Sequence, residues 1–233
     1  MLTRSVASAC AVLFFAALVC AQGSPEGHWE GSLIMNNREI GVSLDLGKNA
    51  KSEWIASMGL PSEKMTGLVV ADVVVNGKSV KLVAVELQMA KFDLTLTSDG
   101  IMKGTASTPQ GPVEIEFKRT GDAKVELIPA SPAVSAELEG DWEGSLQVPN
   151  RAVRIIVHFK NQPDKTVAAT IDTPDSGGRG LPLNDVKQTG RQVEFGIKIA
   201  HGSFKGTLNQ EGTELAGQFG HEENSMPLTF RKK

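Results

Sequence analysis

The sequence predicts an all-β protein built from two tandem antiparallel meander β-barrels, or flattened barrels or sandwiches, of about eight strands each. Two observations lead to this prediction. The pentapeptide Trp29–Leu33 recurs unchanged as Trp142–Leu146, about 113 residues later, which indicates an internal repeat. Within each copy, apolar residues alternate with polar ones at a period of two, which is typical of antiparallel strands with one buried face.

The repeat extends over most of each copy. Residues 27–82 align with residues 140–195 without a gap, and about sixteen of these aligned positions are identical. One residue of slippage follows near Val83, where the apolar alternation changes phase, and we interpret it as a β-bulge. The alignment then resumes and passes through two pairs of phenylalanines, Phe92/Phe204 and Phe117/Phe230.

Each strand is predicted from an alternating run that ends at a turn sequence. In the first copy, residues 40–46 form such a run, and Asn76-Gly77 and Asp99-Gly100 are turn sequences. In the second copy, the same reasoning predicts strands at residues 141–147, 151–160, 165–172, 179–187, 191–199, 202–208, 213–219 and 226–232. Meander strands in this number leave no spare edge when they close into a barrel.

Four segments follow from these patterns. Residues 1–21 are expected to be a signal peptide, residues 22–119 the first barrel, residues 120–138 a linker and residues 139–233 the second barrel. The linker loses the alternation and is rich in Pro, Ala and Ser. We expect one strand around Val125–Ile128 to lie against a domain.

The N-terminal segment predicts an exported protein, in the periplasm or outside the cell. Arg4 precedes an apolar stretch from Val6 to Val19, and the small residues before Gln22 suit cleavage after Ala21. The alternative is a lipoprotein anchored through Cys20. Both cysteines lie in this segment, so the mature chain would have no disulfide and would depend on its hydrophobic cores for stability.

Composition argues against several partners. The formal net charge is -3 and no block of like charge occurs, so nucleic acid and anionic membranes are poor partners. The chain has no Tyr and 3 Trp, whereas sugar-binding modules usually stack glycans on exposed aromatic rings. The apolar N-terminal run is shorter than the roughly 20 residues of a membrane-spanning helix.

The start of each copy resembles that of the calycins, the lipocalin and avidin barrels. The motif is Gly-x-Trp on the first strand, here with Trp29 and Trp142. In that family the Trp closes one end of the barrel and packs beside a basic residue of the last strand. The resemblance therefore implies barrel-closing or ligand-lining roles for these Trp residues and for the basic residues that end each copy, which are Lys118, Arg119, Arg231 and Lys232.

The second copy also resembles the small all-β domain that precedes the catalytic domain of some secreted bacterial α/β-hydrolases. The shared features include Gly140-x-Trp142-x-Gly144-x-Leu146, the segment from Ala169 to Gly177, and Phe204-x-Gly206-x-Leu208. In that family the domain is an accessory module, so the resemblance implies no catalytic activity. The chain itself contains no Gly-x-Ser-x-Gly nucleophile elbow.

Few residues offer catalytic or metal chemistry. The four histidines have no spacing that would place metal ligands on one element, so we expect no metal site and no cofactor. Asp172 and Asp175 lie near one loop of the second copy and could bind Ca²⁺ or act as an acid/base pair, and Arg179 in the same loop could hold an anion. The alternative is that the two aspartates shape a tight turn, since the first copy has Gly59 and Ser62 at their positions.

These observations favour a non-catalytic accessory or binding protein that recognises a protein partner or a small apolar ligand. A barrel of eight strands is just wide enough to be filled by side chains or to hold one small molecule, and we expect a filled interior. Two alternatives stay open. One is a hydrolase-like enzyme with its site at Asp172, Asp175 and Arg179. The other is a structural, self-associating envelope protein. The sequence does not define the oligomeric state.

Overall fold

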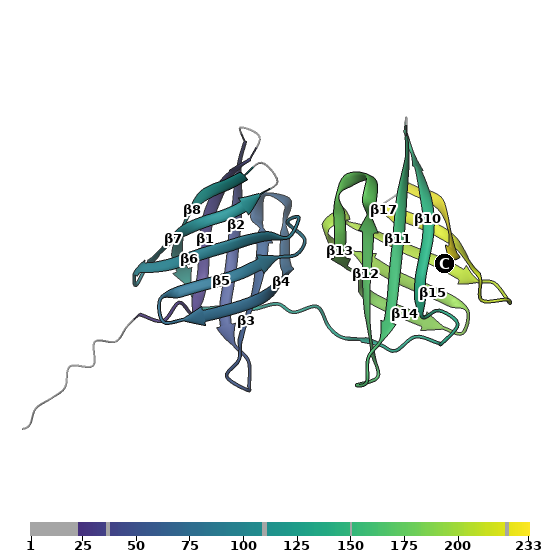
Figure 1. Cartoon of the computed structure of the whole chain (residues 1–233), viewed down its shortest axis with the longest axis horizontal. Coiled ribbons are helices and arrows are strands. Elements are labelled where there is room, and N and C mark those ends of the chain that lie inside the picture. The colour runs from purple at the N-terminus through teal and green to yellow at the C-terminus, as the bar shows by residue number, and fades with distance from the viewer. Residues whose placement is uncertain (1–22, 36–37, 109–110, 150, 222–223) are drawn as a thin grey trace, which may run out of the picture.

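The computed structural model describes residues 23–35, 38–108, 111–149, 151–221 and 224–233. The predicted signal peptide, with Cys10 and Cys20, lies outside these ranges. Two β-barrel-like bodies stand side by side, joined by an extended linker (Figure 1). The all-β prediction is confirmed. Within the described ranges, none of the helices is long and apolar enough to cross a membrane.

The first barrel is a closed meander of eight strands, in which β1 pairs with both β2 and β8. All its strand pairs are antiparallel, and a single 3-10 turn, η1 (Pro61–Glu63), follows β3. The strands are β1 (Gly27–Met35), β2 (Arg38–Lys48), β3 (Trp54–Leu60), β4 (Met65–Asn76), β5 (Ser79–Ala84), β6 (Ala90–Ser98), β7 (Ile101–Thr108) and β8 (Gly111–Gly121).

The second barrel repeats this order but does not close completely. The expected strand at residues 179–187 is split at Leu183 into β13 and β14, which form the two ends of the sheet. Pro182 has no N–H to donate at this break. The strands are β10 (Gly140–Val148), β11 (Arg151–Asn161), β12 (Thr166–Thr173), β13 (Gly178–Pro182), β14 (Asn184–Thr189), β15 (Gln192–Ile197), β16 (Gly202–Leu208), β17 (Glu214–His221) and β18 (Asn224–Lys232), with 3-10 turns η2 (Pro174–Ser176) and η3 (Lys198–Ala200).

A β-bulge lies next to Val83, where the pairing of β4 with β5 shifts between Ala71 and Val74. The second barrel has the matching shift between Asn184 and Lys187, so the bulge does not cause the slippage. The extra residue lies in the connection between β5 and β6, residues 85–89, which is one residue longer than the matching connection at residues 198–201. Val83 itself is buried, with 7% of its surface exposed.

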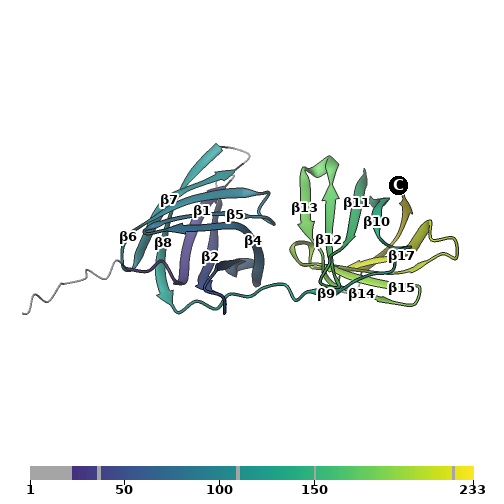
Figure 2. The ribbon, with the colours of Figure 1, turned by 60° about the horizontal axis from the view of Figure 1, so that its bottom comes forward.

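The linker contacts both barrels without forming the strand expected at Val125–Ile128. The backbone N–H of Glu126 donates to Ser57 Oγ of the first barrel over 3.0 Å. Farther on, β9 (Ser131–Pro132) pairs with β12 of the second barrel. Figure 2 shows the linker running from the first barrel to β9. Residues of the linker therefore belong partly to each barrel.

The two cores are filled by different side chains. The second core contains a cluster in which Phe195 stacks on Phe204 with ring centroids 5.0 Å apart, and Phe204 meets Phe230 edge-on at 5.3 Å. In the first core, Phe92 and Phe117 lie 6.5 Å apart, and most of the other buried residues are aliphatic or methionine. Aromatic rings thus fill more of the second core than of the first.

Candidate ligand-binding site

The first barrel has an apolar cavity of about 280 Å³ at one of its ends. This end, the mouth, is where β1, β3, β5 and β7 finish and where β2, β4, β6 and β8 begin. Alternation in these strands turns aliphatic side chains toward the barrel axis, so the wall is mostly hydrocarbon. The cavity is lined by Leu33, Ile40, Val42, Leu60, Glu86, Leu87, Gln88, Ala90, Thr108 and Ile199.

Glu86 is the one ionisable residue in this lining. It lies in the β5–β6 connection and is 5% exposed. Its Oε2 accepts a hydrogen bond from the backbone N–H of Val69 over 2.6 Å, whereas its buried Oε1 has no hydrogen-bond partner among the residues that the structure describes. Burial raises the pKa of this carboxyl above its ordinary value, while the Val69 bond and the positive charge of Lys198 act in the opposite direction.

The second barrel covers part of the mouth. Ile199, on η3, lines the cavity and packs against both hydrophobic cores. Beside it, Lys198 Nζ donates to the carbonyl oxygens of Thr66 (3.0 Å) and Gly67 (3.3 Å) on β4. Gly67 has a φ of 64°, and a Cβ at this position would lie 3.0 Å from Lys198 Nζ. A glycine here therefore lets the two barrels approach.

Trp29 lies near the start of β1, at the end of the first barrel opposite the mouth, and Trp142 lies near the start of β10 in the second barrel. Trp29 is fully buried and donates from Nε1 to the carbonyl oxygen of Pro25, and Arg119 stacks over its ring at 4.7 Å. In the second barrel, Trp142 donates to the carbonyl oxygen of Leu138, with Lys232 5.5 Å from the ring centroid. Both Trp rings are buried, and neither lines the cavity at the mouth.

The other two predicted basic residues face away from the Trp rings. Lys118 and Arg231 are both exposed. The guanidinium of Arg231 forms an ion pair with Glu214 over 3.5 Å. Since alternate residues of a strand point to opposite faces, only one residue of each basic pair can lie over the indole. The structure places Arg119 and Lys232 there.

The predicted loop residues of the second barrel are engaged in backbone contacts. Asp172 Oδ1 accepts from the N–H of Gly180 over 2.7 Å, and Asp175 Oδ2 accepts from the N–H of Arg154 over 3.1 Å. Arg179 is exposed. The Asp172 bond spans the loop between β12 and β13, and the Asp175 bond links η2 to β11, so both carboxylates hold this loop in place. Within the described part of the chain, no group of three or more metal-ligating residues occurs.

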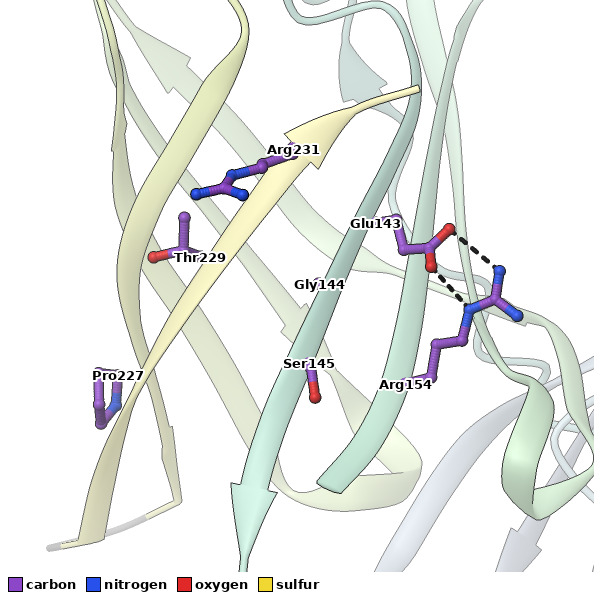
Figure 3. Close-up of a pocket in the computed structure, with 7 residues that line it drawn as sticks. All are labelled: Glu143, Gly144, Ser145, Arg154, Pro227, Thr229 and Arg231. Atoms are coloured by element: carbon purple, nitrogen blue, oxygen red, sulfur yellow. Dashed lines mark hydrogen bonds and ion pairs between the residues drawn. The ribbon is translucent and has the colours of Figure 1, made fainter. Parts of the chain in front are cut away.

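A second hollow, of about 630 Å³, lies on the outer surface of the second barrel (Figure 3). It runs between β10 and β18 and contains an ion pair, in which Arg154 Nε lies 2.8 Å from Glu143 Oε1. Hydrogen bonds from Arg154 and Lys233 lower the pKa of Glu143 to about 2. Because this hollow is open and its charges are paired, we regard the cavity at the mouth as the stronger candidate.

Sequence reasoning missed Glu86 and Ile199. Both lie in connections between strands, where the period-two pattern no longer says which side chains point inward. One signal was present: Glu86 is a single acidic residue within the apolar stretch Leu82–Leu87. What the sequence does not show is that Glu86 Oε2 accepts a hydrogen bond from Val69 on β4.

Comparisons with known proteins add little to this geometry. No protein-family model and no curated protein matches the chain. Among solved structures, a protein of unknown function from the DUF3598 family of Nostoc punctiforme has 11% identity and a TM-score of 0.28, with 88% of this chain and 94% of that chain covered. A "putative outer membrane protein" from Bacteroides fragilis has 16% identity and a TM-score of 0.27, with 89% and 97% covered. No enzyme family is indicated. The resemblances to calycins and to hydrolase accessory domains stay predictions.

Proposed function

We propose that this chain is an exported, non-catalytic binding protein that holds a small apolar ligand at the mouth of its first barrel. The cavity at the mouth carries the proposal, because ligand sites are typically concave, mainly apolar and provided with a few polar groups. The N-terminal sequence supports export. We assign Asp172 and Asp175 to turn structure and not to a hydrolytic site, since both carboxylates accept backbone N–H groups.

The cavity is small, which limits the ligand. A volume of about 280 Å³ has room for roughly nine non-hydrogen atoms, at about 30 Å³ for each water-sized group. A medium-length aliphatic chain has this size, whereas a long-chain lipid exceeds it.

Titration calorimetry with 1-heptanol tests the function, since this alcohol has eight heavy atoms and an apolar chain. We expect saturable binding at one site. Ala90→Leu places a larger side chain in the cavity and should abolish binding. The control Ala216→Leu, at an exposed position of the second barrel, should leave binding unchanged. Native mass spectrometry of protein purified from its exported fraction would then reveal a natural ligand as an extra mass. Equal binding by the Ala90→Leu variant would show that the cavity is not the site.

A further inference from the structure

The polar groups of the cavity wall are unevenly satisfied. The hydroxyl of Thr108 donates to the carbonyl oxygen of Gly111 over 2.8 Å. Lys198 Nζ, the cation near Glu86, already donates to two carbonyl oxygens of β4. In contrast, Glu86 Oε1 is buried and has no partner among the described residues. Among the described residues of the wall, which also include the exposed Gln88, Glu86 thus keeps one unused acceptor and there is no cation.

The structural role of Glu86 accounts for only one of its oxygens. Oε2 satisfies the N–H of Val69 on β4. The aligned residue of the second barrel is Pro182, which has no N–H, and the hairpin that corresponds to the Glu86 loop carries Lys198 in place of an acid. A neutral acceptor such as glutamine would also satisfy Val69. The carboxylate adds a second oxygen, and leaving a buried acceptor unpaired costs free energy.

We propose that the ligand is a small amphiphile with an apolar body and a hydrogen-bond-donating head group, an amine or an alcohol, that pairs with Oε1 of Glu86. The inference rests on the binding function proposed above and names its ligand class. A donor head group supplies the partner that Oε1 lacks, while the aliphatic wall takes the hydrocarbon body. A carboxylate ligand would place a second negative charge beside Glu86 in a site that water does not screen well.

Four probes of nearly equal size separate head-group chemistry from apolar burial. Heptylamine and 1-heptanol each carry a donor, 1-methoxyhexane is an isomer of 1-heptanol without one, and heptanoate carries a negative charge. By calorimetry near neutral pH, we expect the amine and the alcohol to bind about tenfold more tightly than the ether and heptanoate. A stronger response to the amine than to the alcohol would identify a cationic head group, and the reverse a neutral one.

Glu86→Gln tests the role of the carboxylate. The glutamine carbonyl can still accept from Val69, so the fold is retained, but its NH₂ group replaces the unpaired acceptor. We expect the preference for amine and alcohol over ether to disappear, while Glu114→Gln, at an exposed position of β8, keeps it. Retention of the preference in Glu86→Gln, or equal binding of all four probes to the unmodified protein, would overturn the ligand class and leave the binding function standing. Failure of all four to bind would overturn both.

Discussion

The two barrels are copies of one unit, and they differ most at the mouth. Both have a buried Trp that donates to a carbonyl four residues earlier, with a cation of the last strand over its ring. At the mouth, however, the first barrel has Val69 held by Glu86, whereas the second has Pro182 and a break between β13 and β14. The end that the Trp closes is thus common to the two copies, and the end that could hold a ligand is not.

A second difference is that a His–Asp pair present in both barrels has its two residues on opposite strands. His28 Nδ1 lies 2.9 Å from Asp45 Oδ1 in the first barrel, and His158 Nδ1 lies 2.8 Å from Asp141 Oδ1 in the second. In the alignment the two members of the pair have exchanged strands, so the contact is kept although both residues differ. The two copies thus have the same His–Asp contact between their first two strands, with the residues interchanged.

The largest expected effect comes from removing the shared Trp. Trp29→Ala and Trp142→Ala should each cost about 3–5 kcal/mol in the unfolding free energy of the barrel that contains it, because a fully buried ring leaves a cavity. Hydrogen exchange, followed barrel by barrel, measures this loss. Trp54→Ala is the control, since that ring is only partly buried. Equal loss of protection in both barrels after either change would show that the copies unfold as one unit.

The aromatic cluster provides the next effect. Phe204→Leu breaks close contacts with Phe195 and Phe230, whereas Phe92→Leu breaks one contact, with Phe117 at 6.5 Å. We expect the change in the second barrel to cost about 1 kcal/mol more. Urea unfolding of both variants checks this difference. Equal costs would mean that ring contacts add nothing beyond the burial of the aromatic side chain.

A smaller effect should follow from loosening the contact between the barrels. Lys198→Met keeps the apolar stem but removes the hydrogen bonds to Thr66 and Gly67, which we expect to weaken this contact by about 1 kcal/mol. Faster hydrogen exchange in residues 65–69 would report the loosening. Lys205→Met, which removes an exposed ion pair with Glu194, should leave these amides unchanged. Unaltered exchange in Lys198→Met would contradict a covering role for η3.

The last prediction concerns pH. Burial raises the pKa of Glu86 above its ordinary value of 4.5, so the folded barrel binds this proton more tightly than the unfolded chain does. Its contribution to stability is fully present below the ordinary pKa and is lost as pH rises through the raised value. As the pH rises from 4.5 through the raised pKa, the unfolding free energy of the natural protein should therefore fall relative to Glu86→Gln. The same comparison with Glu114→Gln should show no such trend, and a rise with pH would reverse the sign argued here.

The sequence by itself determined the fold class, the repeat and the position of the buried Trp in each first strand. The period-two pattern and the turn sequences are local, and the repeated Trp stands at the same position in each first strand. Arg119 could be placed near Trp29 because it lies near the end of the strand that completes the barrel, although choosing it over Lys118 required the actual pairing of β1 with β8.

Only the tertiary structure decided where a ligand could bind. Glu86 and Val69 come together because two strands pair, and Lys198 meets Thr66 although 132 residues separate them in the chain. Both Glu86 and Ile199 lie in connections, where no periodicity indicates a direction. The break at Leu183 and the covering of the mouth by η3 likewise depend on hydrogen bonds and packing between segments distant in the sequence. Local patterns specify strands, whereas a cavity exists only where several strands leave space between them.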